Sequence, residues 1–127
     1  MINIVFDVSG CTRPNPPATS LLQAMRDTAA LLGCTVLGEL PVAFQPHGAT
    51  CVIVLAESHL TVSTWPEHHM AYIDVFTCRA DVEPATAIKP ILAVLGASNA
   101  GVARQRIHRL RPARLSQPVG LTVSTGP

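Results

Sequence analysis

The sequence has few charged and few aromatic residues. Asp, Glu, Lys and Arg together make up 13% of its 127 residues and aromatic residues 4%, whereas hydrophobic residues make up 48%. This composition excludes the class of disordered proteins, which combine low hydrophobicity with high net charge. Because little charge is available to cover a surface, we expect an oligomer that buries apolar area. The formal net charge of +1 argues against a nucleic-acid-binding protein.

Cysteine pairs, a leader segment and long apolar runs are also missing. The four cysteines stand far apart with no Cys-x-x-Cys pair, and the chain starts with apolar residues rather than a charged and then apolar leader. We therefore expect a cytoplasmic protein with reduced thiols, not a secreted disulfide scaffold. No apolar run approaches the roughly 18 residues of a membrane-spanning helix, so no membrane partner is expected.

Two local clusters resemble ligand sites. Five of the nine Lys and Arg residues fall between Arg104 and Arg114, which is typical either of a phosphate-binding patch or of a solvated strand edge and tail. The nearly neutral total charge favours the second interpretation. His68 and His69 are adjacent, but no third ligand stands at useful spacing, so we expect no metal site.

The pattern of apolar, polar and turn-forming residues predicts the element order β-α-β-β-β-β-α-β. Thr19 or Ser20 is expected to cap the first helix, Gly33 to end it, and Pro41 to limit the second strand. Strands joined by such short turns must pair antiparallel. The sequence thus predicts one α+β domain over residues 1–127, a two-layer sandwich of an antiparallel sheet with two helices on one face. The expected strands are 3–8, 34–40, 51–56, 60–64, 70–78 and 102–110, and the expected helices are 21–32 and 85–95.

Five short motifs occur in one order along the chain. They are Asp7-x-x-Gly-Cys11, Val36-Leu-Gly-Glu39, Phe44-x-Pro-x-Gly48, Glu57-Ser-His59 followed by Thr64-Trp-Pro-Glu67, and Asp74-Val-Phe-Thr-Cys78. A lone Glu-Ser-His has no meaning, but five motifs in consistent order and spacing are specific. From about residue 3 to residue 80, the chain resembles the S-adenosylmethionine decarboxylases of the prokaryotic, pyruvoyl-dependent type.

The resemblance implies a self-cleaving enzyme whose cofactor is made from Ser58. The Ser58 hydroxyl would attack the carbonyl of Glu57, and elimination would separate a β chain, residues 1–57, from an α chain, residues 58–127, that begins with a pyruvoyl group. That group would form a Schiff base with the substrate amine and accept the electrons of decarboxylation. The apolar run 51–56 would give the weakly nucleophilic hydroxyl a stiff, sequestered setting.

The resemblance also assigns roles to four other residues. Cys78 stands where the family has the acid that reprotonates the carbanion, and a thiol can donate a proton at neutral pH. Glu67 corresponds to the carboxylate that binds the ribose hydroxyls, and Phe44 to an aromatic residue that stacks on adenine. Trp65 either lines the same pocket or belongs to the core.

Two positions depart from the family. Ser63 replaces a histidine, and Thr50 a serine, and both family residues assist self-processing. Thr50 keeps a hydroxyl, whereas Ser63 supplies no base that titrates near neutrality. His59 is expected on the strand face opposite to Ser58. The distances of His68 and His69 from Ser58 stay open at this point.

The first functional prediction is decarboxylation of S-adenosylmethionine to the aminopropyl donor of spermidine synthesis, by a homodimer of processed protomers with the site near their interface. One alternative is a pyruvoyl-dependent decarboxylase of ornithine or arginine, because relatives of the family have changed substrate and position 63 has changed here. Another is an uncleaved, non-catalytic ligand-binding or regulatory protein, because the family histidine is missing. The need for an activator such as putrescine stays open.

Overall fold

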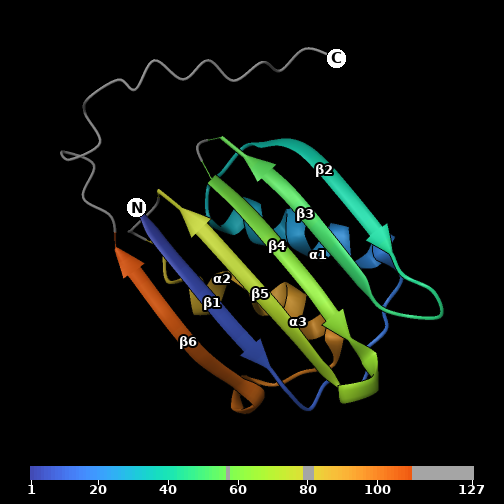
Figure 1. Ribbon diagram of the computed structural model, residues 1–127. Coiled ribbons are helices and arrows are strands. Elements are labelled where there is room, and N and C mark those ends of the chain that lie inside the picture. The colour runs from blue at the N-terminus through green and yellow to red at the C-terminus, as the bar shows by residue number, and fades with distance from the viewer. Residues whose placement is uncertain (57, 79–81, 110–127) are drawn as a thin grey trace.

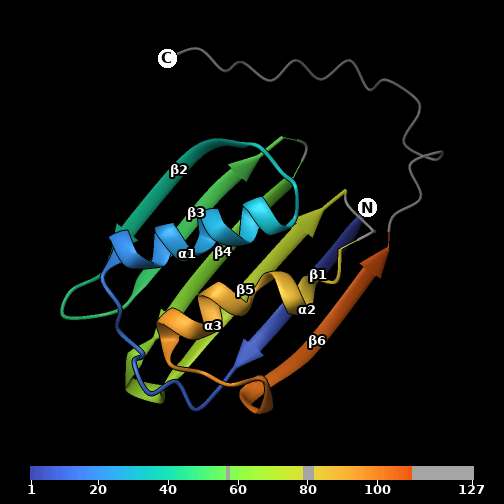
Figure 2. The ribbon, with the colours of Figure 1, turned by 180° about the vertical axis from the view of Figure 1, so that it is seen from behind.

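The computed structural model describes residues 1–56, 58–78 and 82–109, with side chains placed through residue 103. Six strands form one antiparallel sheet in the order β2-β3-β4-β5-β1-β6. Helices α1, α2 and α3 all cover the same face of the sheet, as Figures 1 and 2 show from its two sides. The strands are β1 (Ile2–Val8), β2 (Val36–Ala43), β3 (Ala49–Leu55), β4 (Ser58–Trp65), β5 (Met70–Thr77) and β6 (Val102–Arg109), and the helices are α1 (Ala18–Leu31), α2 (Pro84–Ala87) and α3 (Lys89–Leu95). Short 3₁₀ helices, η1 (Pro66–His68) and η2 (Asn99–Gly101), precede β5 and β6.

Alternate residues of each central strand point toward the helices and form the core. The strand residues Phe6, Val62 and Ile73 are buried there, together with Met25 of α1 and Ile91 of α3. Because side chains alternate between the two faces of a strand, the residues between them lie on the face without helices. We call this the open face. The predicted α+β fold, a two-layer sandwich with helices on one side only, is confirmed.

The predicted second helix is present but divided. Residues 85–95 were expected to form one helix, whereas α2 ends at Ala87 and α3 begins at Lys89. Pro90 explains the division, because it has no N–H to donate to the carbonyl of Thr86 and its ring crowds that carbonyl. Gly33 ends α1 as predicted, with a φ of 70° and the N–H of Cys34 donating to the carbonyl of Ala29 at 2.9 Å.

Two local predictions are wrong. Helix α1 begins at Ala18 after Pro17, and no side chain caps it, so neither Thr19 nor Ser20 has the expected role. Pro17 is itself the N-cap residue, and its carbonyl accepts the first helical hydrogen bond, from the N–H of Leu21 at 3.1 Å. Pro41 does not limit the second strand but lies inside β2, opposite Cys51. Strand β2 is at the edge of the sheet, and an edge strand accepts proline where the missing N–H would face solvent.

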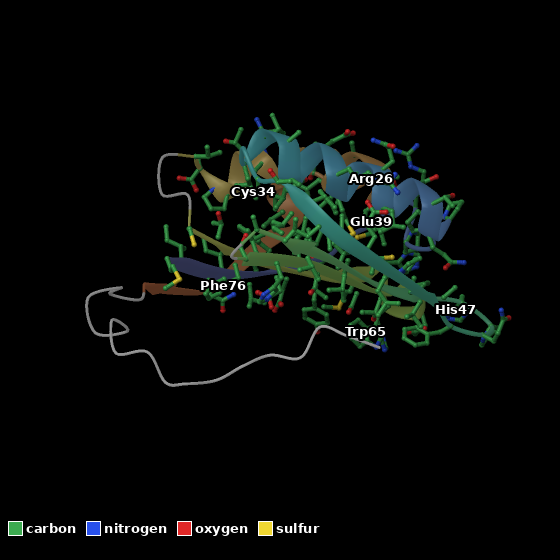
Figure 3. All side chains as sticks on the ribbon, turned by 90° about the horizontal axis from the view of Figure 1, so that it is seen from above. Arg26, Cys34, Glu39, His47, Trp65 and Phe76 are labelled. Atoms are coloured by element: carbon green, nitrogen blue, oxygen red, sulfur yellow. The ribbon has the colours of Figure 1, made fainter. Side chains whose placement is uncertain are left out.

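An ion pair ties this edge strand to the helix layer. The guanidinium of Arg26 on α1 makes two hydrogen bonds to the carboxylate of Glu39 on β2, one of them 2.7 Å between Nη2 and Oε1 (Figure 3). A two-pronged contact of this type fixes direction as well as distance. The pair thereby holds the strand that leads into the hairpin between β2 and β3.

Candidate functional site

Ser58 lies at a tight turn, as the first residue of β4. It pairs with Leu55 of β3, so only two residues connect these strands. Its Oγ lies 3.4 Å from the carbonyl oxygen of Ala56, and the N–H of Ala56 donates to the carbonyl of Thr35 at 3.0 Å. Glu57, the other residue of the predicted cleavage bond, lies outside the described residues. The hydroxyl is therefore held within the turn that contains the bond it is predicted to attack.

Cys78 lies at the same end of the sheet as Ser58. In the pairing of β4 with β5, His59 is opposite Phe76, and one further step of this register brings Ser58 opposite Thr77, directly before Cys78. Cys78 is exposed. By contrast, burial raises the pKa of the thiols of Cys11 and Cys51, so these two sulfurs stay protonated inside the core. We call this edge of the sheet the Ser58 end.

A second group of predicted residues lies at the opposite edge, which we call the Glu67 end. Phe44 is in the turn between β2 and β3, where its N–H donates to the carbonyl of Gly48 at 2.8 Å. Trp65 ends β4, is 42% exposed and contacts Tyr72 edge-to-face, with ring centroids 5.0 Å apart. Trp65 is therefore not a core residue. It projects from the open face (Figure 3).

Glu67 is bound by a histidine that sequence analysis did not identify as functional. Nε2 of His47 lies 2.6 Å from Oε2 of Glu67. This hydrogen bond is the main cause that lowers the pKa of Glu67, and the charges of His47 and His68 act in the same direction. The carboxylate is therefore ionised at neutral pH. His47 occupies a variable position of Phe44-x-Pro-x-Gly48, so only its proximity to Glu67 in the fold reveals it.

The two departures from the family pattern meet on the open face. Thr50 and Ser63 are cross-strand partners on β3 and β4, and their hydroxyl oxygens are 2.9 Å apart. Ser63 is five residues from Ser58 along one strand, a separation of about 17 Å at strand rise. An odd number of steps also places the two side chains on opposite faces. The structure brings Thr50 and Ser63 together but does not bring them to Ser58 of the same chain.

The other histidines are also separated from the Ser58 hydroxyl. His59 projects from the open face as predicted, stacks on Phe76 with ring centroids 5.4 Å apart, and lies 3.6 Å from a carboxylate oxygen of Asp74. His68 and His69 belong to the Glu67 end, where Nδ1 of His69 lies 3.2 Å from the carbonyl oxygen of Cys11. Within one chain, neither His68 nor His69 reaches Ser58.

The described residues contain no group of three metal-ligating side chains. No helix among them has the length and apolar character to cross a membrane. The side chains of the whole basic cluster from Arg104 to Arg114 lie outside the described side chains, so the choice between phosphate patch and solvated edge stays a prediction.

Comparison with known proteins places the chain in one family. The family model for S-adenosylmethionine decarboxylase matches residues 2–109. The chain belongs to the S-adenosylmethionine decarboxylase family. The crystal structure of the adenosylmethionine decarboxylase from Aquifex aeolicus matches with a TM-score of 0.70 and 28% identity over 84% of this chain and 87% of that one. The resemblance inferred from the five motifs is thereby confirmed.

Two curated relatives of this family are named S-adenosylmethionine decarboxylase proenzyme. The one from Symbiobacterium thermophilum is 47% identical over 76 residues, which are 60% of this chain and 58% of the relative. The one from Thermotoga maritima is 40% identical over 80 residues, which are 63% of this chain and 62% of the relative. The matched stretch thus spans about three fifths of these curated relatives. The word proenzyme in both names means that these relatives are made as precursors.

Proposed function

We propose that this protein is a pyruvoyl-dependent S-adenosylmethionine decarboxylase, made as a proenzyme that cleaves itself between Glu57 and Ser58. The observation that carries the proposal is the Ser58 end, where a serine follows the two-residue β3–β4 connection and an exposed cysteine directly follows the last residue of the neighbouring strand β5. The precursor names of the relatives support self-cleavage. The alternatives, an ornithine or arginine decarboxylase and a non-catalytic binding protein, are not favoured by these comparisons.

Ser58 and Cys78, the two functional residues at the Ser58 end, each fit one step of the proposed self-cleavage and decarboxylation. The Ser58 hydroxyl, close to the turn, attacks the carbonyl of Glu57 and shifts the peptide bond to an ester. β-Elimination then releases the Glu57 carboxylate and leaves a dehydroalanine at residue 58, and water replaces its nitrogen, which leaves as ammonia. The pyruvoyl group that results at residue 58 supplies an electron-withdrawing carbonyl for decarboxylation. Cys78 then holds the proton that replaces the lost carboxyl group, since an exposed thiol directly after the adjacent strand is a suitable general acid. The products of cleavage are chains 1–57 and 58–127.

The Glu67 end fits a nucleoside. The ionised carboxylate of Glu67 accepts hydrogen bonds from the two ribose hydroxyls, because a carboxylate offers about four lone-pair sites. Phe44 and Trp65 are half-exposed aromatic side chains beside it, and an aromatic ring binds the flat face of adenine by stacking. Ornithine and arginine have neither a ribose nor a purine, so these residues favour S-adenosylmethionine as the substrate.

One chain alone does not complete the site. Ser58 and Trp65 are at opposite ends of β4, seven residues and about 23 Å apart at strand rise. A substrate held by Phe44 and Glu67 therefore does not reach Ser58 of the same chain. A second copy packed on the open face about a two-fold axis would bring its Glu67 end to the Ser58 end of the first. We accordingly propose a homodimer with two composite sites.

The open face has the composition such an interface needs. Apolar side chains project from it on four neighbouring strands, and an exposed patch of this kind is typical of a surface that binds a partner. In this dimer, the Thr50–Ser63 pair of one protomer would approach the Ser58 end of the other and assist its cleavage. Because Ser63 replaces a histidine, we expect cleavage to be slow. The exposed apolar residues concerned are Leu40, Val42, Val54, Trp65 and Tyr72.

Intact-mass spectrometry of the purified protein tests the proposal directly. The expected result is two fragments, residues 1–57 and 58–127, of roughly 6 and 7 kDa by proportion of length, with the second carrying a pyruvoyl group in place of serine. Carbon dioxide release is then measured separately with S-adenosylmethionine, ornithine and arginine. A chain that stays intact after long incubation would favour the non-catalytic alternative. Carbon dioxide release from ornithine or arginine alone would show that this amino acid, and not S-adenosylmethionine, is the substrate.

A further inference from the structure

The turn between β2 and β3 is fixed against the rest of the Glu67 end. The N–H of Gly48 donates to Oδ1 of Asn15 at 3.0 Å. Gly48 has a φ of 94°, and a Cβ there would lie 3.3 Å from the carbonyl oxygen of Thr64. Glycine is required at this position because the backbone conformation and the close approach both disfavour a side chain. His47, which precedes Gly48, is therefore held in place beside β4 and the η1 helix that follows it.

The contact between His47 and Glu67 has a defined donor. An ionised carboxylate can only accept hydrogen bonds, so Nε2 of His47 carries the proton and donates it to Oε2 at 2.6 Å. This bond engages one of the two carboxylate oxygens. The bond thereby limits the directions that the carboxylate takes at this end of the sheet. His47, in the turn between β2 and β3, and Trp65, the last residue of β4, lie at the same end of the sheet (Figure 3).

A contribution to folding stability does not explain the hydrogen bond between His47 and Glu67. The side chains of His47 and Glu67 are 37% and 44% exposed. Exposed ion pairs contribute little to folding stability, because water screens them and two side chains lose freedom. The effect of this bond falls instead on the direction of the Glu67 carboxylate, which a ligand requires before it binds.

We propose that His47 is a positioning residue that orients the Glu67 carboxylate toward the ribose hydroxyls of the substrate. The inference rests on the proposed function and adds a residue from a variable position of the motif Phe44-x-Pro-x-Gly48. The imidazole does not contact the reacting atoms. It lowers the cost of ordering Glu67, so its loss weakens nucleoside binding and raises KM while kcat at saturating substrate changes little.

The test uses two probes that differ only in the two ribose hydroxyl groups. Binding of 5′-methylthioadenosine and of its 2′,3′-dideoxy analogue to the purified protein is measured by calorimetry for the native protein, His47→Ala, His47→Gln and His68→Ala. We expect His47→Ala to bind methylthioadenosine about tenfold more weakly, the usual effect of losing a charge-assisted hydrogen bond, and to bind the dideoxy analogue almost as the native protein does. Glutamine can place an amide nitrogen near the position of Nε2, so His47→Gln should recover part of the affinity.

His68→Ala is the matched control. It removes the histidine next to Glu67 in the sequence, which acts on that carboxylate only through its charge, and it should leave both affinities unchanged. Equal weakening of the two probes by His47→Ala would overturn the inference, since a general disturbance of the turn would not distinguish them. Native affinity in His47→Ala would overturn it as well. If the native protein binds neither probe, the proposed function is contradicted, and the inference, which rests on it, is contradicted as well.

Discussion

The two ends of strand β4 differ in what they contain. The Ser58 end has a hydroxyl in a two-residue hairpin and a neighbouring thiol, groups suited to breaking and protonating bonds. The Glu67 end has an ionised carboxylate, a histidine and two half-exposed aromatic rings, groups suited to binding a nucleoside. In the proposed function, the chain thus separates chemistry from recognition along one strand. In the proposed homodimer the two ends meet across the interface, so dimer formation and catalysis are expected to depend on each other.

The largest effect is expected for Ser58→Ala. Without the hydroxyl no group remains to attack the Glu57 carbonyl, so cleavage and decarboxylation should both be abolished, while the Glu67 end should still bind methylthioadenosine. Denaturing electrophoresis and calorimetry measure these two properties separately. Any slow cleavage of the alanine variant would show that the Ser58 end does not act as proposed.

Cys78→Ala should separate cleavage from turnover at the same end. The variant keeps the Ser58 hydroxyl and should cleave normally, but its turnover should fall by about 10²–10⁴-fold, the usual effect of losing a positioned general acid. Misdirected protonation should also inactivate it gradually, by converting the pyruvoyl group to alanine. Turnover is measured per pyruvoyl group, which removes any effect of reduced folding. Turnover near that of the native protein would exclude Cys78 from the mechanism.

Mixing two inactive variants tests whether the sites are composite. One variant is Cys78→Ala and the other is the double variant Phe44→Ala with Glu67→Gln, so each chain has one intact end. After random exchange of subunits, half of the dimers are mixed and each has one intact site, which predicts recovery of about a quarter of the native activity. No recovery despite proven exchange would mean that each chain forms its own site.

Ser63→His should give the smallest change. Restoring a base that titrates near neutrality should shorten the half-time of cleavage by about tenfold, a modest part of what general-base catalysis can supply. Thr50→Ser serves as a matched control, because it changes the hydrogen-bonded neighbour of Ser63 and keeps its hydroxyl. An unchanged or slower half-time for the histidine variant would indicate that another group already accepts the proton.

The sequence predicted most of the fold because the relevant signals are local. Turn residues separate strands of alternating burial, and Gly33 ends α1 by a backbone conformation that glycine adopts readily. The wrong predictions depend on structure that the local sequence does not show. Pro41 was expected to end a strand because the sequence does not reveal that β2 is an edge strand. Thr19 was expected to cap a helix that instead begins at Ala18, directly after Pro17. For the site, the motifs identified Ser58, Cys78, Phe44 and Glu67 as candidates, whereas His47 was missed because its partner is twenty residues away.

By itself, the sequence determined the family, the composition of the core and the residue types for each proposed step, because motifs and periodicity depend on positions along the chain. The tertiary structure alone decided which of these residues meet. The register of β3, β4 and β5 places Cys78 at the same end of the sheet as Ser58 and sets Thr50 against Ser63, and the β2–β3 turn brings His47 to Glu67. The same register keeps the two ends of β4 apart. Strand pairing fixes distances between residues far apart in sequence, and no local pattern contains that information.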